Sequence, residues 1–160
     1  MIKHITYLIL IIIISSCNQN LIDKWQNYDE SDEIKTNSKL ENKRLQFKRI
    51  QSISNDKNKL MDGFEKEISV FIGNEYELVK ALVFEKSIPE IQQNIIDGKL
   101  TYYKLSLFYL SRIYLIEFDQ ETYLNSIISI NKNILKEAKR KDKIKNTNIY
   151  SLYGIPILLK

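Results

Sequence analysis

The chain has 160 residues and a mass of 19.0 kDa, a size that allows one small domain with an appendage. Its formal net charge of +4 is too mild to demand a nucleic-acid partner, and we expect none. The single histidine and the single cysteine, His4 and Cys17, both lie in the first 17 residues. If that segment is processed, a Ser-His-Asp triad, a Cys-His pair and a zinc site are excluded, and we expect no metal or other cofactor.

The N-terminus has the pattern of an export signal. Lys3 and His4 precede an apolar run from Ile5 to Ile14, which is too short to cross a bilayer as a helix, since that needs about 20 residues. The next residues, Ile14-Ser15-Ser16-Cys17, resemble the lipobox of bacterial lipoproteins. This resemblance implies that residues 1–16 are a signal peptide and that Cys17 is lipidated and anchors the chain in the membrane. We therefore expect an exported lipoprotein of the cell envelope, in the outer membrane or at the surface if the cell has one. An uncleaved N-terminal anchor with an incidental cysteine is the alternative.

Residues 17–39 are predicted to be a lipid-anchored flexible linker, because they contain few apolar residues. The acidic cluster at Asp29, Glu30, Asp32 and Glu33 lacks the glycine and the spacing of a calcium loop, so we interpret it as solvated linker. Trp25 and Tyr28 could rest at the lipid headgroups or pack on the domain, and the sequence leaves both open.

Residues 40–86 are predicted to form a helical extension. Apolar residues at Leu40, Leu45, Phe47, Ile50 and Ile53 predict a moderately amphipathic helix. The spacing is clearer from Leu60 to Ile72, with an end at Gly73-Asn74, and residues 75–86 predict another short helix.

Residues 87–118 predict two helices. Ser87-Ile88-Pro89-Glu90 has the pattern of a capping box with proline in the first turn, and Gly98 is placed to end that helix in a left-handed conformation. Thr101 then caps a helix that continues to about Phe118 and is apolar almost all round. Such a helix is buried on most faces or needs a partner surface.

The remaining residues predict a strand, a helix and a second strand. A short strand is predicted by the apolar residues Leu124, Ile127, Ile128 and Ile130, which lie between polar residues. Asn131 is expected to cap a helix from Lys132 to about Lys143, with Ile134, Leu135 and Ala138 facing inward. The last ten residues predict a turn followed by an extended segment over 155–159. Apart from these strands the predicted fold is mainly α.

Four short motifs in residues 87–160 follow one another in a specific order. The first is Gly98-Lys99-Leu100-Thr101 with Tyr109-Leu110-Ser111-Arg112-Ile113, and the second is Leu124-Asn125-Ser126-Ile127 with Ile130-Asn131. The third is Ala138 with Asp142, and the fourth is Leu152-Tyr153-Gly154-Ile155-Pro156-Ile157-Leu158-Leu159-Lys160. Together they resemble the opening of the amidase signature family. The resemblance implies that this stretch comprises the N-terminal helices and first strand of the family's α/β domain, in truncated form.

The resemblance places one catalytic residue in this sequence. The lysine that ends the matching strand in amidases corresponds to Lys160, which implies a neutral lysine base acting through a cis-serine on a nucleophilic serine. A lysine base needs a pKa lowered toward 7. In the family both serines follow this lysine in a Gly/Ser-rich segment, so we expect a frameshift, a premature stop or an incomplete gene product, inactive alone. The implied substrate of the full-length family member is a small-molecule or peptide amide. By itself, Lys160 would be an ordinary solvated lysine.

Two other functions remain open. The chain could be a surface lipoprotein that acts as a small helical binding module. It could also resemble the A subunit of an amidotransferase that acts on misacylated tRNA, although an export signal argues against a cytoplasmic substrate.

Two side-chain clusters are explained by structural roles without a binding function. The basic cluster of Lys136, Lys139, Arg140, Lys141, Lys143 and Lys145 fits a solvated helix end, with anionic lipid contact as the alternative. The tyrosines at 102, 103, 109, 114 and 123 lie among Leu and Ile, which favours packing over base stacking.

Overall fold

The computed structural model describes residues 22–27, 29–46, 56–144 and 146–159. Within these residues the chain is helical and contains no strand, in agreement with the mainly α prediction. The helices are α2 (Ser31–Asn37), α3 (Lys57–Met61), α4 (Glu65–Asn74), α5 (Tyr76–Val83), α6 (Ile88–Ile96), α7 (Tyr102–Glu117) and α8 (Ile134–Asp142), with a short 3-10 helix η1 (Lys43–Leu45).

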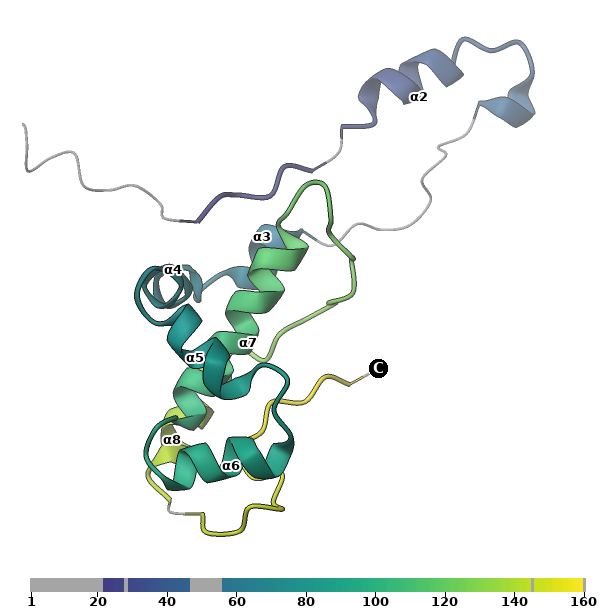
Figure 1. Ribbon diagram of the computed structural model, residues 1–160. Coiled ribbons are helices and arrows are strands. Elements are labelled where there is room, and N and C mark those ends of the chain that lie inside the picture. The colour runs from purple at the N-terminus through teal and green to yellow at the C-terminus, as the bar shows by residue number, and fades with distance from the viewer. Residues whose placement is uncertain (1–21, 28, 47–55, 145, 160) are drawn as a thin grey trace, which may run out of the picture.

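Helix α7 is the centre of the fold. Its 16 residues run through the body of the molecule, where α4, α5 and α8 contact it (Figure 1). Leu105, Phe108 and Leu110 on this helix are almost completely buried. Of the two alternatives that the sequence left open for this helix, burial on most faces is the one that the structure shows. Tyr109 and Leu115 on this helix remain exposed.

The predicted start and stop signals of α6 and α7 are confirmed. Glu90 accepts a hydrogen bond from the backbone N–H of Ser87 at 2.8 Å, which forms the capping box of α6. Gly98 follows α6 with φ at +73°, the left-handed conformation that ends a helix with little strain only at glycine. The hydroxyl of Thr101 accepts from the backbone N–H of Lys104 at 3.1 Å and so caps α7.

A single hydrophobic core extends across the predicted boundary between residues 86 and 87. Its members come from the start of the described chain, from α3 to α8 and from the connection before α7: Ile22, Leu60, Met61, Phe64, Ile68, Phe71, Val79, Val83, Ile91, Leu100, Leu105, Leu107, Phe108, Leu110 and Leu135. The spacing from Leu60 to Phe71 is helical as predicted, but Gly63, with φ at +86°, separates α3 from α4. The helix predicted over 75–86 is α5.

Both predicted strands are wrong for the residues that the structure describes. The segment from Leu124 to Ile130 is irregular, Asn125 has a left-handed φ of 52°, and Leu124 and Ile128 are exposed. Residues 155–159 are irregular as well, after a turn at Tyr153-Gly154. A strand needs a hydrogen-bonded neighbour, and no described segment is placed as one.

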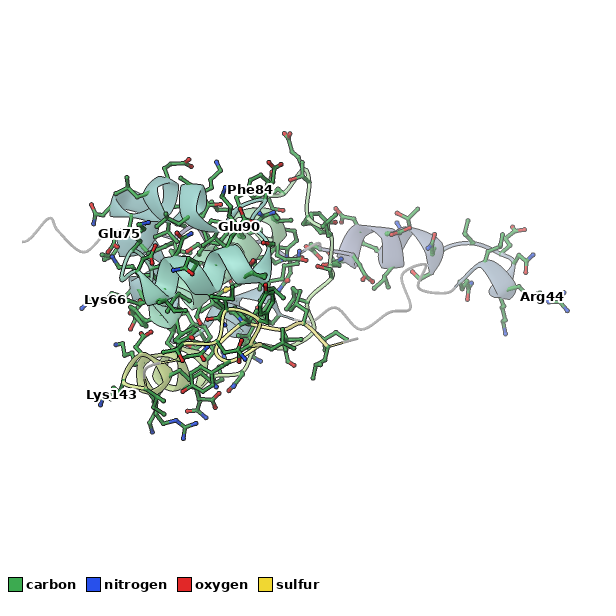
Figure 2. The ribbon with its side chains drawn as sticks, turned by 60° about the horizontal axis from the view of Figure 1, so that its bottom comes forward. Arg44, Lys66, Glu75, Phe84, Glu90 and Lys143 are labelled. Atoms are coloured by element: carbon green, nitrogen blue, oxygen red, sulfur yellow. The ribbon has the colours of Figure 1, made fainter. Side chains whose placement is uncertain are left out.

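Helix α2 was not expected, because residues 17–39 were predicted to be a flexible linker. Asp29 accepts a hydrogen bond from the backbone N–H of Ser31, and Asp32 and Glu33 occupy the first turn, where negative charge suits the helix dipole. Helix α2 stands away from the rest of the molecule in Figure 1, and Arg44, in η1, does so in Figure 2. The helix predicted from Leu40 is represented by η1, and its continuation over 47–55 lies outside the described residues.

Helix α8 begins two residues later than predicted. Its first residue is Ile134, and Asn133 occupies the cap position. Asn131 accepts from the backbone N–H of Asn133 at 2.9 Å and so forms the turn before the helix. Leu135 and Ala138 face inward as expected.

Candidate functional site

The two residues that the sequence assigned to function, Cys17 and Lys160, lie outside the described residues. The structure instead describes the segment that leads to Lys160 and the helices that hold this segment. The candidate site is therefore the junction between α6, α7, α8 and residues 146–159.

Gln92 fixes the C-terminal segment to α6. Its side-chain amide donates to the carbonyl oxygens of Ser151 at 2.7 Å and Tyr153 at 2.9 Å. Gln92 is 0% exposed, and its carbonyl partners are half-buried. A buried amide that satisfies two backbone carbonyls specifies the path of the segment, because leaving those groups unpaired would be costly. Gln92 carries no distinctive signal in the sequence, because a glutamine in a helix belongs to no recognisable pattern.

Tyr102 completes this polar network from α7. Its hydroxyl donates to Oε1 of Gln92 at 3.0 Å, and its side chain is 1% exposed. Burial raises the pKa of the Tyr102 hydroxyl, so the group stays protonated and remains a donor. The Tyr102 ring also meets the Tyr153 ring edge to face at 5.5 Å between centroids.

Gly154 lies directly against the Tyr102 ring. A Cβ built on Gly154 would be 2.5 Å from Cε1 of Tyr102 and closer still to Cδ1. Its φ of +73° is in the left-handed region that favours glycine. Only glycine allows the backbone to approach the tyrosine ring this closely.

Asp142, at the end of α8, caps the start of α7. Its two carboxylate oxygens accept from the backbone N–H groups of Tyr102 at 2.7 Å and Tyr103 at 3.2 Å. The negative charge lies at the positive end of the α7 dipole, which stabilises α7 and joins the end of α8 to its start. The sequence marked Asp142 as a motif residue, and the structure supplies a physical role for it.

A mostly apolar groove of about 570 Å³ runs between α7, the loop after it and the C-terminal segment. Tyr109, Ile113 and Ile116 form its α7 wall, and Pro156 to Leu158 form the opposite rim. Ile157 and Leu158 are exposed, and Leu159 beyond them is 93% exposed. Arg112 lines the same groove, with its guanidinium 5.0 Å from the centroid of the Phe84 ring.

A buried ion pair holds the other end of α7. Lys57 Nζ lies 3.3 Å from Glu117 Oε2, with side chains 8% and 3% exposed, and it also donates to the Glu117 carbonyl at 2.7 Å. Glu117 accepts further bonds from the backbone N–H groups of Asn125 and Ser126 and from the Ser126 hydroxyl, at 2.6 to 2.9 Å. Burial acts to raise the pKa of Glu117, but the bonds from Ser126 and Lys57 outweigh it and hold the pKa below its ordinary value. These contacts give the loop its irregular path in place of the predicted strand.

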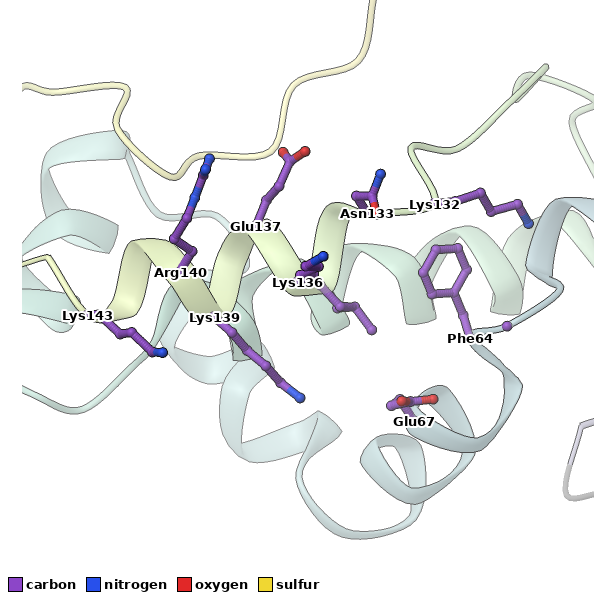
Figure 3. Close-up of a pocket in the computed structure, with 11 residues that line it drawn as sticks. Phe64, Glu67, Lys132, Asn133, Lys136, Glu137, Lys139, Arg140 and Lys143 are labelled. Atoms are coloured by element: carbon purple, nitrogen blue, oxygen red, sulfur yellow. The ribbon is translucent and has the colours of Figure 1, made fainter.

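A second, basic groove of about 790 Å³ lies between the start of α4 and helix α8 (Figure 3). Phe64 and Glu67 line it together with cations on α8 and just beyond its two ends: Lys132, Lys136, Lys139, Arg140 and Lys143. Lys132 donates to the carbonyl oxygens of Lys59 and Asp62 at 2.9 Å, and so binds the end of α3. Lys139 lies 4.5 Å from the Tyr103 ring centroid. The groove can attract anions, but its lining contains no nucleophile paired with a base.

The tyrosines of the sequence cluster are packing residues. Tyr102 is buried, Tyr114 accepts from the backbone N–H of Asp23, and Tyr123 contacts the Trp25 ring. Trp25 therefore packs on the domain, the possibility that the sequence left open, whereas Tyr28 lies outside the described residues.

No protein-family model matches the chain, and comparisons with curated proteins and with solved structures find no match. In the part of the chain that the structure describes, no three His, Cys, Asp or Glu side chains gather in a group that could hold a metal ion. The helices of that part are all too short or too polar to span a bilayer.

Proposed function

We propose that this chain is a lipoprotein that contributes the N-terminal helices of an amidase-signature domain. The observation that carries the proposal is that three of the four sequence motifs meet in one junction. Tyr102 follows the Thr101 cap. Its backbone N–H donates to the Asp142 carboxylate, and its ring contacts Gly154. Asp142 and Gly154 are 40 and 52 positions from Tyr102 in the sequence. The Asp142 carboxylate accepts from two backbone N–H groups, and the missing side chain of Gly154 leaves room for the Tyr102 ring.

The apolar groove also supports the proposal. In the amidase-signature resemblance, the segment from Ile155 to Leu159 is a strand of a mixed sheet. Here it ends in exposed apolar side chains beside a groove of about 570 Å³. Contiguous exposed apolar surface marks a site of association. Further strands of such a sheet would pair with residues 155–159 and cover the groove.

Lys160 is proposed as the general base of this site. It directly follows Leu159, so a sheet built on residues 155–159 would carry its side chain into a desolvated environment. Desolvation disfavours the ammonium form and lowers the pKa of a lysine toward the range that proton transfer at neutral pH requires. The partner serines and the amide substrate are those implied by the resemblance.

The test is hydrolysis of an aryl amide by two purified proteins. The first is residues 17–160 joined to the coding sequence downstream of codon 160, and the second is residues 17–160 alone. We expect turnover only by the first, and its loss on Lys160→Ala. Clear turnover by the second that survives Lys160→Ala would overturn the assignment. Lys143→Ala, in the basic groove, is the matched control and leaves turnover unchanged.

The anchor is proposed at Cys17, on the Ile14–Cys17 pattern. Membrane fractionation and mass spectrometry of the purified protein test it. The expected product begins at an acylated Cys17, and Cys17→Ala leaves the signal uncleaved. A protein with an intact Met1 or an unmodified Cys17 would contradict the proposal.

A small helical binding module is the second candidate, and the shared core favours it. Because the buried residues of α3 to α8 form one cluster, the helices can fold as one unit without an added sheet. Cooperative thermal unfolding of residues 17–160 together with no amidase-coding sequence downstream would favour this function over the amidase.

A further inference from the structure

The chain that follows the proposed lipid anchor is docked on the domain. Ile22 is buried in the hydrophobic core, and the backbone N–H of Asp23 donates to the Tyr114 hydroxyl at 3.0 Å. Trp25 and Asn58 exchange two hydrogen bonds, from the Trp25 N–H to Asn58 Oδ1 and from Asn58 Nδ2 to the Trp25 carbonyl, both at 3.0 Å. Residues 22–25 therefore belong to the folded body.

The Trp25 side chain makes further contacts between this segment and the rest of the domain. The Lys57 ammonium lies 3.8 Å from the Trp25 ring centroid and 4.1 Å from that of Tyr123, and the two rings meet edge to face at 4.8 Å. We call Trp25, Lys57 and Tyr123 the Trp25 clamp. Cation–π contacts of a partly desolvated ammonium are among the stronger of their kind. The clamp joins the N-terminal segment, α3 and the loop after α7.

We propose that the Trp25 clamp holds the domain close to the lipid bilayer, with the C-terminal end of α7 nearest to it. This inference rests on the proposed acylation of Cys17. Five Cα–Cα steps separate Cys17 from Ile22, a reach of at most about 18 Å. If the chain were free as far as Lys57, the r.m.s. span of those 40 steps would be about 35 Å. Helix α7 has 16 residues and is about 24 Å long, so its N-terminal end lies farther from the anchor.

The contacts of the clamp place the Trp25 ring on the domain and not at the lipid headgroups. Tryptophan is favoured at membrane interfaces because its ring is apolar and its N–H is polar. In this structure the ring face is occupied by the Lys57 ammonium, and its edge contact is with Tyr123. Trp25 therefore fixes the N-terminal segment to the domain, and the acyl chains at Cys17 attach the chain to the bilayer.

The test uses the full chain, produced in a host that acylates lipoproteins and reconstituted in phosphatidylcholine vesicles that carry a headgroup acceptor dye. Because the Cys17 thiol is acylated, a donor dye can be placed on one added cysteine, either Glu121→Cys beside the clamp or Lys99→Cys before α7. With the two positions separated by the length of α7, about 24 Å, energy transfer is expected to be about twofold or more higher from position 121. Trp25→Ala should remove most of this difference, whereas Gln26→Ala, a change at an exposed neighbour, should preserve it.

The outcomes separate the two proposals. Mass spectrometry reports acylation of Cys17, and an unmodified Cys17 would overturn both the lipoprotein proposal and this inference. Equal energy transfer from the two positions in an acylated, folded protein would overturn the inference alone. Because Trp25 is the single tryptophan, acrylamide quenching of its fluorescence reports the clamp without lipid. Tyr123→Ala should raise that quenching about twofold by removing one wall of the clamp, and unchanged quenching would contradict the clamp.

Discussion

Gly154 lies against the ring of Tyr102, so closely that no other residue fits at that position with this backbone. The contact joins the C-terminal segment to the first turn of the central helix. It also gives a steric reason for a glycine that the sequence showed only as part of a motif.

Gly154→Ala is expected to lower the free energy of unfolding by about 2–3 kcal/mol, or to release the C-terminal segment, because the added methyl group overlaps the Tyr102 ring. Gly98→Ala is the matched control. Gly98 has the same φ of +73° but nothing within 4 Å of the added Cβ, so it should cost only the backbone strain, about 1 kcal/mol. Urea unfolding, with hydrogen exchange over residues 151–155, measures both. Equal losses of unfolding free energy in the two variants would contradict the contact between Gly154 and the Tyr102 ring.

Tyr102→Phe removes the hydroxyl that donates to Gln92 and keeps the ring. The Gln92 oxygen then retains only a long contact of 3.5 Å from Asn146, so we expect a loss of about 1–2 kcal/mol in urea unfolding. Tyr150→Phe, at an exposed residue, should change stability by no more than about 0.5 kcal/mol. If Tyr102→Phe left the unfolding free energy unchanged, water would have replaced the hydrogen bond between Tyr102 and Gln92.

Asp142→Ala removes the carboxylate that caps α7 from the end of α8. Two backbone N–H groups lose their acceptor, and the expected cost is about 1–2 kcal/mol by thermal or urea unfolding. Asp62→Ala removes an exposed carboxylate that makes no hydrogen bond or ion pair among the described residues, and should be close to neutral. If both variants unfolded alike, the cap would contribute nothing.

Glu117→Gln tests the buried ion pair and its pH dependence. The variant leaves Lys57 without its counter-charge and should lose about 3 kcal/mol at neutral pH. Because the folded-state pKa of Glu117 lies below its ordinary value of 4.5, its contribution is complete above about pH 4.5 and is lost as the pH falls through the folded-state pKa.

The corresponding measurement is stability as a function of pH between neutral and strongly acidic solution. Wild type should lose the extra stability below about pH 4.5, and the difference from Glu117→Gln should shrink there. Glu121→Gln, in the same loop but exposed, should follow wild type. A constant difference between wild type and Glu117→Gln across this range would contradict the assignment.

Local signals in the sequence were sufficient for the two ends of α6 and the start of α7. The Ser87–Glu90 capping box, Gly98 and Thr101 act within one turn of chain, so their effect does not depend on distant residues. The strands failed for the opposite reason. Alternating apolar residues at 124–130 have a strand pattern, but Glu117 binds that loop through backbone N–H groups and no neighbouring strand competes for them.

The sequence by itself determined the helical class, the ends of α6 and α7 and the positions of the motif residues, because capping and helical periodicity are short-range effects. Only the tertiary structure decided that Gln92 holds the C-terminal segment, that Asp142 caps a helix 40 residues earlier and that Trp25 packs on Lys57. Each of these contacts joins residues far apart in the chain. Its energy arises only when packing of the core brings the partners together and removes them from water.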